Sequence, residues 1–248
     1  MNTIALNPIG RLGNQMFEYA FMRKYAKRHG FRLEVNNWLG RKLFGHNDPF
    51  PSKHYRLIIE SNSINNQPIS NGIWHSNPPV HDVIMEGYFQ YHTSFYRTEM
   101  EDFKNLFRPV EKGRLDQRCQ VFNNRTVIGC HLRRGDFGFD SMHPITPSSL
   151  YLEWLDSIWN TVPNPLLFLC SDEYGKVAGD FTKYNPITFG EVYDDFYALM
   201  NCQFLAVSNS TFSFLAAMLN SNVVAMRPDP SKNKLVRYDP WDSQVALG

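Results

Sequence analysis

The second half of the chain alternates between short apolar runs and segments with helical periodicity. The apolar runs are "TVIGCHL", "LLFLC", "QFLAV" and "VVAM". Between them, apolar residues recur at helical spacing, as do Phe212, Leu215, Ala216 and Leu219. Apolar runs without polar alternation are typical of parallel strands that helices cover on both faces. The sequence therefore predicts an α/β fold built on a parallel sheet, with one further strand at "PITF", residues 186–189.

The N-terminal part repeats this strand-helix-strand pattern. A strand is predicted at "TIAL", a helix with an apolar stripe from Met16 to Tyr25 follows, Gly30 caps it, and "FRLEV" forms the next strand. The segment "RPVEKGRLDQR", which starts at residue 108, is polar and contains a proline and a glycine. We therefore predict a domain boundary there, which divides the chain into residues 1–110 and 111–248.

Composition excludes several classes of protein. The net charge of +1 offers no clustered basic surface for nucleic acid. No apolar run approaches the roughly 20 residues that span a bilayer, and the first residues do not resemble a signal peptide, so we expect a cytoplasmic protein without a transmembrane segment. The four cysteines lack the spacing of metal ligands and are expected to be small buried hydrophobes.

The loop "HLRRGD" follows the first apolar run of the second half. Ligands of open parallel sheets bind at the carboxyl ends of the strands, and arginine suits phosphate because its planar fork donates two parallel hydrogen bonds. Arg133 and Arg134 are adjacent and should point opposite ways. We expect one of them to reach a ligand and the other to pair with Asp136 or another carboxylate; the alternative is that both form ordinary salt bridges.

Two further loops follow strands of the same predicted sheet. In "SNSTFS", Ser210 or Thr211 can cap the next helix, whose free amide groups would bind an anion. In "CSDEYG", Asp172 could accept hydrogen bonds from a purine or a ribose. For both loops the alternative is an ordinary helix cap.

The N-terminal turn "GRLGNQ" lacks the glycine spacing of a P-loop or of a dinucleotide-binding fingerprint. Gly10 and Gly13 would let the backbone approach a ligand, and Asn14 and Gln15 offer donors and acceptors at the start of a helix. A tight turn that only begins the helix is the alternative.

Five stretches occur in order that together resemble glycosyltransferase family 11, the α-1,2-fucosyltransferases. They are "GRLGNQMFEYAF", "EGYFQ", "HLRRGDF", "FLCSDE" and "SNSTFSFLAAML", and they extend the resemblance from about Leu6 to Leu219. The arginine motif and the "GRLGNQ" turn also look like those of α-1,6-fucosyltransferases and protein O-fucosyltransferases.

The resemblance implies a GT-B fold, in which two Rossmann-like domains face each other across a cleft. It implies an inverting transfer of fucose from GDP-β-L-fucose without a metal, with the acceptor on the side of residues 1–110 and the donor bound by residues 111–248. Catalysis would fall to Arg134 or Arg133, with Arg134 favoured, together with Asn14. The implied donor-binding residues are Gly13, Gln15, His131 (through its backbone), Arg133, Arg134, Asp136, Asp172, Asn209, Ser210, Thr211 and Ser213.

The acceptor is less constrained. The resemblance implies a galactoside that receives fucose in α-1,2 linkage, free or as a lipid-linked oligosaccharide. Another GDP-sugar, another linkage such as protein O-fucosylation, or a non-catalytic nucleotide- or glycan-binding module are the alternatives. His46, Asp48, Glu86 and His92 are candidates for a general base, unless a phosphate oxygen takes the proton. Residues 38–79 contain no motif that resembles the family.

Overall fold

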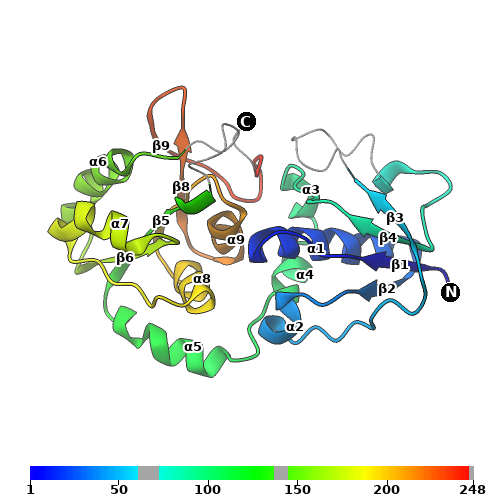
Figure 1. Ribbon diagram of the computed structural model, residues 1–248. Coiled ribbons are helices and arrows are strands. Elements are labelled where there is room, and N and C mark those ends of the chain that lie inside the picture. Colours follow the sequence, from blue (N-terminus) through cyan, green and yellow to red (C-terminus); the bar gives the residue numbers. More distant parts are fainter. Residues whose placement is uncertain (61–72, 137–144, 246–248) are drawn as a thin grey trace. The chain divides into compact units, whose positions relative to one another are not determined.

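The computed structural model describes residues 1–60, 73–136 and 145–245, and its contacts divide the chain into two compact units (Figure 1). The first unit is Met1–Glu111 together with a C-terminal segment that begins at Asp242, and the second is Lys112–Trp241. The predicted boundary after residue 110 lies beside the start of the second unit. The segment after Trp241 differs from the prediction, because Thr93 forms three hydrogen bonds with the backbone of Ser243 and so holds it in the first unit.

The first unit contains a parallel sheet of four described strands in the order β2-β1-β4-β3. The strands are β1 (Thr3–Leu6), β2 (Arg32–Val35), β3 (Arg56–Ile59) and β4 (Val83–Glu86). The helices are α1 (Leu12–His29), α2 (Leu39–Phe44), α3 (Ser94–Arg97) and α4 (Met100–Leu106), with a 3₁₀ turn at Ile73–His75. β2 lies on one side of β1, and β4 and β3 lie on the other. The direction in which successive strands are added to this parallel sheet therefore changes between β1 and β4.

Helix α1 confirms the sequence-based prediction of the first strand-helix-strand unit. Its apolar stripe is buried, with Met16, Phe17 and Phe21 at 0% exposure. Gly30 ends the helix in the left-handed conformation, with φ 64°, which a residue with a Cβ atom rarely adopts. Basic residues occupy the last turn, where they complement the partial negative charge of the helix end.

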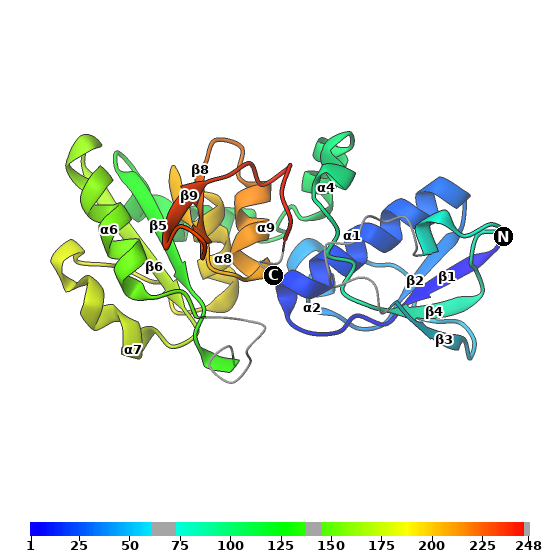
Figure 2. The same ribbon diagram turned by 90° about the horizontal axis from the view of Figure 1, so that it is seen from above.

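The second unit contains a five-stranded sheet in the order β6-β5-β7-β8-β9, in which the strands from β6 to β8 are parallel. Figure 2 shows α6 and α7 on one side of β5 and β6, and α8 and α9 on the other. The strands are β5 (Thr126–Leu132), β6 (Pro165–Ser171), β7 (Phe204–Ala206), β8 (Val224–Asp229) and β9 (Lys234–Arg237). The α-helices are α5 (Lys112–Arg118), α6 (Ser148–Ile158), α7 (Tyr174–Val177), α8 (Val192–Met200) and α9 (Thr211–Leu219). Short 3₁₀ segments cover Cys119–Phe122, Trp159–Thr161 and Ala178–Tyr184. The strand order reverses between β5 and β7.

Two expectations about the strands are wrong. "PITF" is not a strand, because Pro186 has no N–H and the N–H of Phe189 donates to the Asp195 carboxylate, which leaves only Ile187 paired with β6. The series does not close with "VVAM" either: β9 adds an antiparallel edge strand to β8. β3 falls in the stretch where the sequence offered no motif.

The side chains of β5 alternate between the two faces of the sheet. Ile128, Cys130 and Leu132 belong to the core that includes Leu150 and Leu155 of α6. The intervening residue Gly129 faces the other side, where an added Cβ would lie 2.7 Å from Sγ of Cys202, 3.1 Å from Leu205 and 3.2 Å from Leu199 of α8. The two residues that follow β5 continue this alternation, and it decides where each arginine lies.

Candidate functional site

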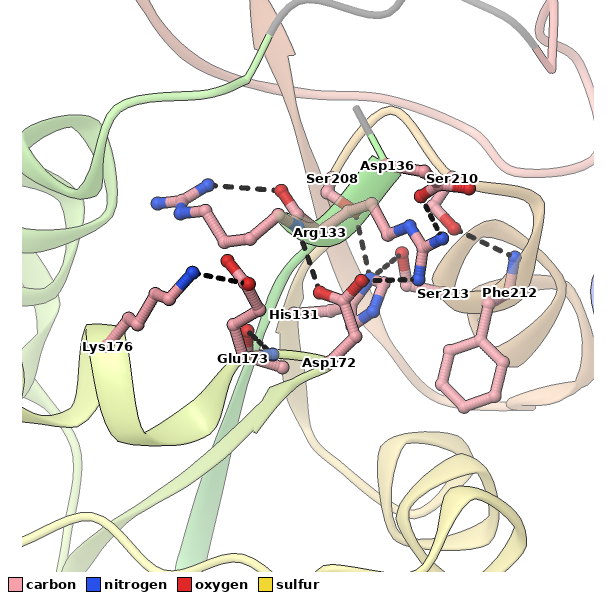
Figure 3. Close-up of polar contacts among 12 residues, drawn as sticks. His131, Arg133, Asp136, Asp172, Glu173, Lys176, Ser208, Ser210, Phe212 and Ser213 are labelled. Atoms are coloured by element: carbon pink, nitrogen blue, oxygen red, sulfur yellow. Dashed lines mark hydrogen bonds and ion pairs between the residues drawn. The ribbon is translucent and has the colours of Figure 1, made fainter. Parts of the chain in front are cut away.

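Arg133 lies at the carboxyl end of β5 between two carboxylates (Figure 3). Its Nη1 is 2.6 Å from Oδ2 of Asp172, which directly follows β6, and its Nη2 donates to Asp136 in its own loop. Only 10% of the Arg133 side chain is exposed. Two anionic partners fix the direction of this guanidinium, so a ligand would meet a charge that is already oriented.

Gly135 allows this arrangement to form. A Cβ at this position would lie 2.5 Å from Oδ2 of Asp172, and the backbone has φ +21°. The other carboxylate oxygen, Oδ1 of Asp172, accepts the backbone N–H of Arg134 at 2.9 Å. Asp172 therefore braces the arginine loop with both oxygens, whereas the resemblance implied that it would lie near a guanine.

Arg134 points to the opposite face from Arg133, as predicted for adjacent residues of an extended segment. Its guanidinium donates to the carbonyl of Thr146 at 2.9 Å and to Oγ of Ser148 at 3.2 Å, at the start of α6. Burial lowers the pKa of this guanidinium below its ordinary value. The arginine paired with Asp136 is Arg133, and both arginines take part in holding the loop.

His131 shares the face of Arg133 and is 4% exposed. Its Nδ1 is 2.8 Å from Oγ of Ser213 and 2.9 Å from Oγ of Ser208. Burial, with smaller contributions from the two neighbouring guanidiniums, lowers the pKa of His131 to about 3, so the ring is neutral near pH 7. Its backbone carbonyl accepts the hydroxyl of Tyr151 at 3.1 Å, and the implied contact of this backbone with a ligand stays a prediction.

Ser213 is fully buried, with 0% exposure, and its hydroxyl faces His131. The contact of Ser213 with phosphate or ribose that the resemblance implies stays a prediction; here the hydroxyl binds His131 from the inner face of α9. Ser208 was not singled out in the sequence. Its position one residue after "QFLAV" was the available signal, since side chains that follow a strand directly lie at the ligand-binding edge of the sheet.

The loop from β7 to α9 brings a helix start to the same place. Ser210 is the N-cap, and its side chain accepts the N–H of Phe212 at 3.4 Å, which confirms the predicted cap. The Phe212 ring lies 5.3 Å from the ring of His131. Asn209 is 7% exposed, and Thr211 is the first residue of the helix. The strand order changes direction between β5 and β7. This point brings together Arg133, His131 and the amides at the start of α9.

In the first unit, the "GRLGNQ" turn begins α1, and its polar side chains bind within the unit. Gln15 donates to the carbonyl of Gly10 at 3.2 Å and accepts the N–H of Leu39 at 3.3 Å. Asn14 accepts Nε2 of Gln90 at 3.1 Å. Gly13 is buried in the first helical turn. Gln15 therefore links the turn to the start of α2 by hydrogen bonds, which the sequence did not predict.

Three of the four general-base candidates take part in local packing. Asp48 is 7% exposed, and it accepts the hydroxyl of Tyr19 at 2.8 Å and pairs with Arg23 at 3.1 Å. His46 stacks on Tyr19 with ring centroids 4.2 Å apart, its Nε2 is 2.6 Å from the carbonyl of Leu106, and burial lowers its pKa. His92 is 2.9 Å from Ser94 at the start of α3.

Glu86 differs from these three because it ends β4, beside the carboxyl end of β1. Its Oε1 accepts Nδ2 of Asn7 at 2.5 Å. Glu18, which the sequence analysis did not single out, is 0% exposed beneath this pair and accepts the N–H of Ile9 at 2.9 Å. Burial, together with the negative charge of Glu86, raises the pKa of Glu18 to about 8. A glutamate inside an apolar helix stripe was the sequence signal for it.

The fold and the strand-end clusters define a class. Two Rossmann-like units, each with polar groups gathered at the carboxyl ends of its parallel strands, make up the GT-B architecture of glycosyltransferases. The family comparison is specific: residues 1–227 match the model of glycosyl transferase family 11, and the chain belongs to this family. A comparison with curated proteins finds no match.

Solved structures share the fold at low sequence identity. NodZ α-1,6-fucosyltransferase co-crystallised with GDP has a TM-score of 0.64 at 15% identity, with 96% of this chain and 99% of that chain covered. A mutant of Arabidopsis thaliana FUT1 in complex with GDP has a TM-score of 0.62 at 14% identity, covering 97% and 74%. POFUT1 in complex with GDP has a TM-score of 0.55 at 13% identity, covering 88% and 94%.

Two searches of the described residues gave negative results. No helix within residues 1–60, 73–136 or 145–245 is long and apolar enough to cross a bilayer. In the same part of the chain, histidines, cysteines and carboxylates form no group of three or more that could hold a metal ion.

Proposed function

We propose that this chain transfers L-fucose from GDP-β-L-fucose to a hydroxyl of a glycan acceptor. The family supports a glycosyl transfer, and the solved structures with this fold include NodZ α-1,6-fucosyltransferase soaked with GDP-fucose. The observation that carries the proposal is the position of Arg133. Arg133 lies on the same face of β5 as His131 and the start of α9. This is the point between β5 and β7 where the strand order changes direction.

The chemistry explains why a cation and helix amides belong together there. When the bond between C1 of fucose and the β-phosphate oxygen breaks, the electron pair stays on the phosphate. A guanidinium that is already oriented, and amide groups that already point at the anion, stabilise this charge without reorganising. We propose that Arg133 and the α9 N-terminus bind the diphosphate of the donor.

The sequence-based preference was for Arg134 as the indispensable arginine. The contacts favour Arg133 as the arginine that binds the donor, because the Arg134 guanidinium binds Thr146 and Ser148 on the α6 side of the loop. We propose that Arg134 acts as a positioning residue, which holds the loop so that Arg133 meets the phosphate. Asp136 and Asp172 brace Arg133 from its two sides.

The finer features of the reaction are part of the same proposal. Transfer inverts the configuration at C1 and needs no metal ion, because a guanidinium supplies the charge that Mg²⁺ supplies elsewhere. The acceptor is a galactoside, which receives fucose in α-1,2 linkage. The sequence motifs and the family support this acceptor, and an acceptor panel tests it.

The decisive experiment measures GDP release and glycan product in the presence of EDTA, with GDP-fucose and a panel of β-galactosides. Arg133→Ala should lower kcat by about 10²–10³, the usual effect of removing one donor to a developing oxyanion, and should weaken GDP binding. Arg134→Ala should lower the melting temperature and reduce kcat less. Wild-type turnover of another GDP-sugar in place of GDP-fucose would overturn the donor assignment, and a larger loss in Arg134→Ala would reverse the two roles.

A further inference from the structure

We propose that Glu86 is the general base of the transfer, and that Asn7 positions it. The inference rests on the proposed function and deepens it, since it assigns the group that takes the proton of the acceptor hydroxyl. It also marks the carboxyl ends of β1 and β4 as the place where that hydroxyl binds.

The first argument is topological. Asn7 follows β1 and Glu86 ends β4, and these two strands are neighbours with Leu6 opposite Met85. β1 connects through α1 to β2 on its other side, so the direction of winding changes between β1 and β4. Open α/β sheets bind their ligands at the carboxyl edge at such a point. The second unit follows the same rule, with Arg133 and Ser208 beside the change of direction between β5 and β7.

The second argument is a chain of hydrogen bonds that orients the carboxylate. Nδ2 of Asn36 donates to Oδ1 of Asn7 at 2.7 Å, and Nδ2 of Asn7 donates to Oε1 of Glu86 at 2.5 Å. The Asn7 amide has one orientation that satisfies both contacts, so the relay holds Glu86 through Oε1. Among the described residues, the hydrogen bond to the Glu86 side chain goes to Oε1, and we propose that Oε2 receives the hydroxyl.

The third argument is the charge of the neighbouring acid. Glu18 lies on α1 and binds the same loop as Asn7 through the N–H of Ile9. Its Oε1 is buried and has no hydrogen-bond partner among the described residues. Burial and the charge of Glu86 raise the pKa of Glu18 to about 8, so Glu18 carries a proton at neutral pH. One acid and one carboxylate at a single site is the division that a base requires.

The step balances without a further reactant. The acceptor oxygen forms a bond to C1 of fucose as the bond between C1 and the β-phosphate oxygen breaks. The electron pair of the broken bond leaves with GDP, and the proton of the acceptor hydroxyl passes to Oε2 of Glu86. Proton transfer to a positioned carboxylate contributes about 10²–10⁴ to the rate of such steps.

The test compares Glu86→Gln with Glu34→Gln. Glutamine keeps the shape of Glu86 and an oxygen for Asn7 but is not basic. Glu34 is a matched control, since it is a buried carboxylate of β2 that binds Ser52 and Tyr55 at 2.7 and 2.8 Å and lies outside the proposed site. Melting temperature, GDP affinity, kcat for fucosyl transfer and its dependence on pH are measured for both variants and for the wild type.

We expect Glu86→Gln to lower kcat for transfer at least 100-fold while GDP affinity stays within twofold of wild type. The wild-type kcat should fall toward low pH as the base becomes protonated, and this fall should be absent in Glu86→Gln. Among the described residues, Asn7 donates to Glu86, Asn36 donates to Asn7, and the charge of Glu86 acts on the acid of Glu18 from α1. Asn7→Ala should lower kcat for transfer while GDP affinity stays within twofold of wild type, since it removes the donor that orients the carboxylate.

The outcomes separate this inference from the proposed function. If the wild type transfers fucose and Glu86→Gln retains kcat and the low-pH fall, the base is not Glu86 and the proposed function stands. If kcat falls equally in Glu86→Gln and Glu34→Gln in step with melting temperature, Glu86 is a structural carboxylate and the inference is overturned. If the wild type turns over no GDP-fucose at all, the proposed function fails first.

Discussion

Asp172 lies 2.6 Å from Arg133, and the two residues come from the ends of neighbouring strands, β6 and β5. The same carboxylate accepts the backbone N–H of Arg134 at 2.9 Å. One aspartate therefore fixes both the guanidinium and the backbone of the loop that carries it. This contact makes the loop sensitive to small changes of volume near Asp172.

Gly135→Ala is expected to damage the site without unfolding the unit. The new Cβ would lie 2.5 Å from Oδ2 of Asp172, so the carboxylate must move away from Arg133. We expect GDP affinity to fall at least tenfold in a calorimetric titration. Gly113→Ala is the matched control, since a Cβ there meets nothing within 4 Å and alanine favours the helix α5. Unchanged GDP affinity in Gly135→Ala would show that the contact has no part in binding.

His131 should make stability depend on pH. The folded state holds the ring neutral with a pKa of about 3, whereas the unfolded chain binds a proton below its ordinary value of 6.5. Protonation therefore favours the unfolded state, and stability is lost as pH falls from about 6.5 toward 3. Between pH 7 and pH 5 the loss should be about 1–2 kcal/mol by urea unfolding. His131→Phe cannot bind this proton, and an equal loss in that variant would contradict the assignment.

Glu18 should act in the opposite direction. The folded state keeps a proton on Glu18 up to about pH 8, while the unfolded chain releases it above 4.5. Stability from this group is therefore present below pH 4.5 and falls as pH rises toward 8. Glu18→Gln should be more stable than wild type at pH 7.5, by roughly 1–3 kcal/mol, and about equal to it near pH 4.5.

Glu34→Gln serves as the control of opposite sign for Glu18→Gln. Burial opposes ionisation of Glu34, but hydrogen bonds from Ser52 and Tyr55 leave its pKa below the ordinary value. Its contribution to stability is therefore present above the unfolded pKa, and Glu34→Gln should be less stable than wild type at pH 7.5. A loss of stability at this pH in Glu18→Gln as well would contradict the raised pKa of Glu18.

Arg114→Ala should destabilise the second unit without altering the donor site. Arg114 donates two hydrogen bonds, of 2.9 and 2.8 Å, to the Asp194 carboxylate, whose side chain is 5% exposed. Removing Arg114 leaves the buried Asp194 charge paired with Arg118, at 3.4 Å. We expect a loss of about 1–3 kcal/mol, since Arg114 itself is half exposed. Lys112→Ala, which breaks an exposed pair with Asp116, should cost about 0.5 kcal/mol or less.

Much of the fold followed from local pattern. The apolar run of β5, the stripe of α9 and the glycine that ends α1 are features that neighbouring residues impose on one another. They were predicted because the spacing of apolar side chains and the conformational range of glycine act over a few residues. The strand expected at residues 186–189 failed because Asp195, in the following helix, captures the N–H of Phe189. The pattern of residues 186–189 does not show that the Asp195 side chain, rather than a neighbouring strand, accepts this N–H.

By itself the sequence determined the class of fold, the family, and the loops that would lie at the ends of the strands. Motif, periodicity and order along the chain are sufficient for these. Tertiary structure alone decided which side chains meet: Arg133 rather than Arg134 on the α9 face, Ser213 turned inward to His131, and Glu86 beside Asn7 with Glu18 beneath. The physical reason is that contacts between residues 39 or 79 positions apart depend on strand register and helix packing, which arise only when the sheets form.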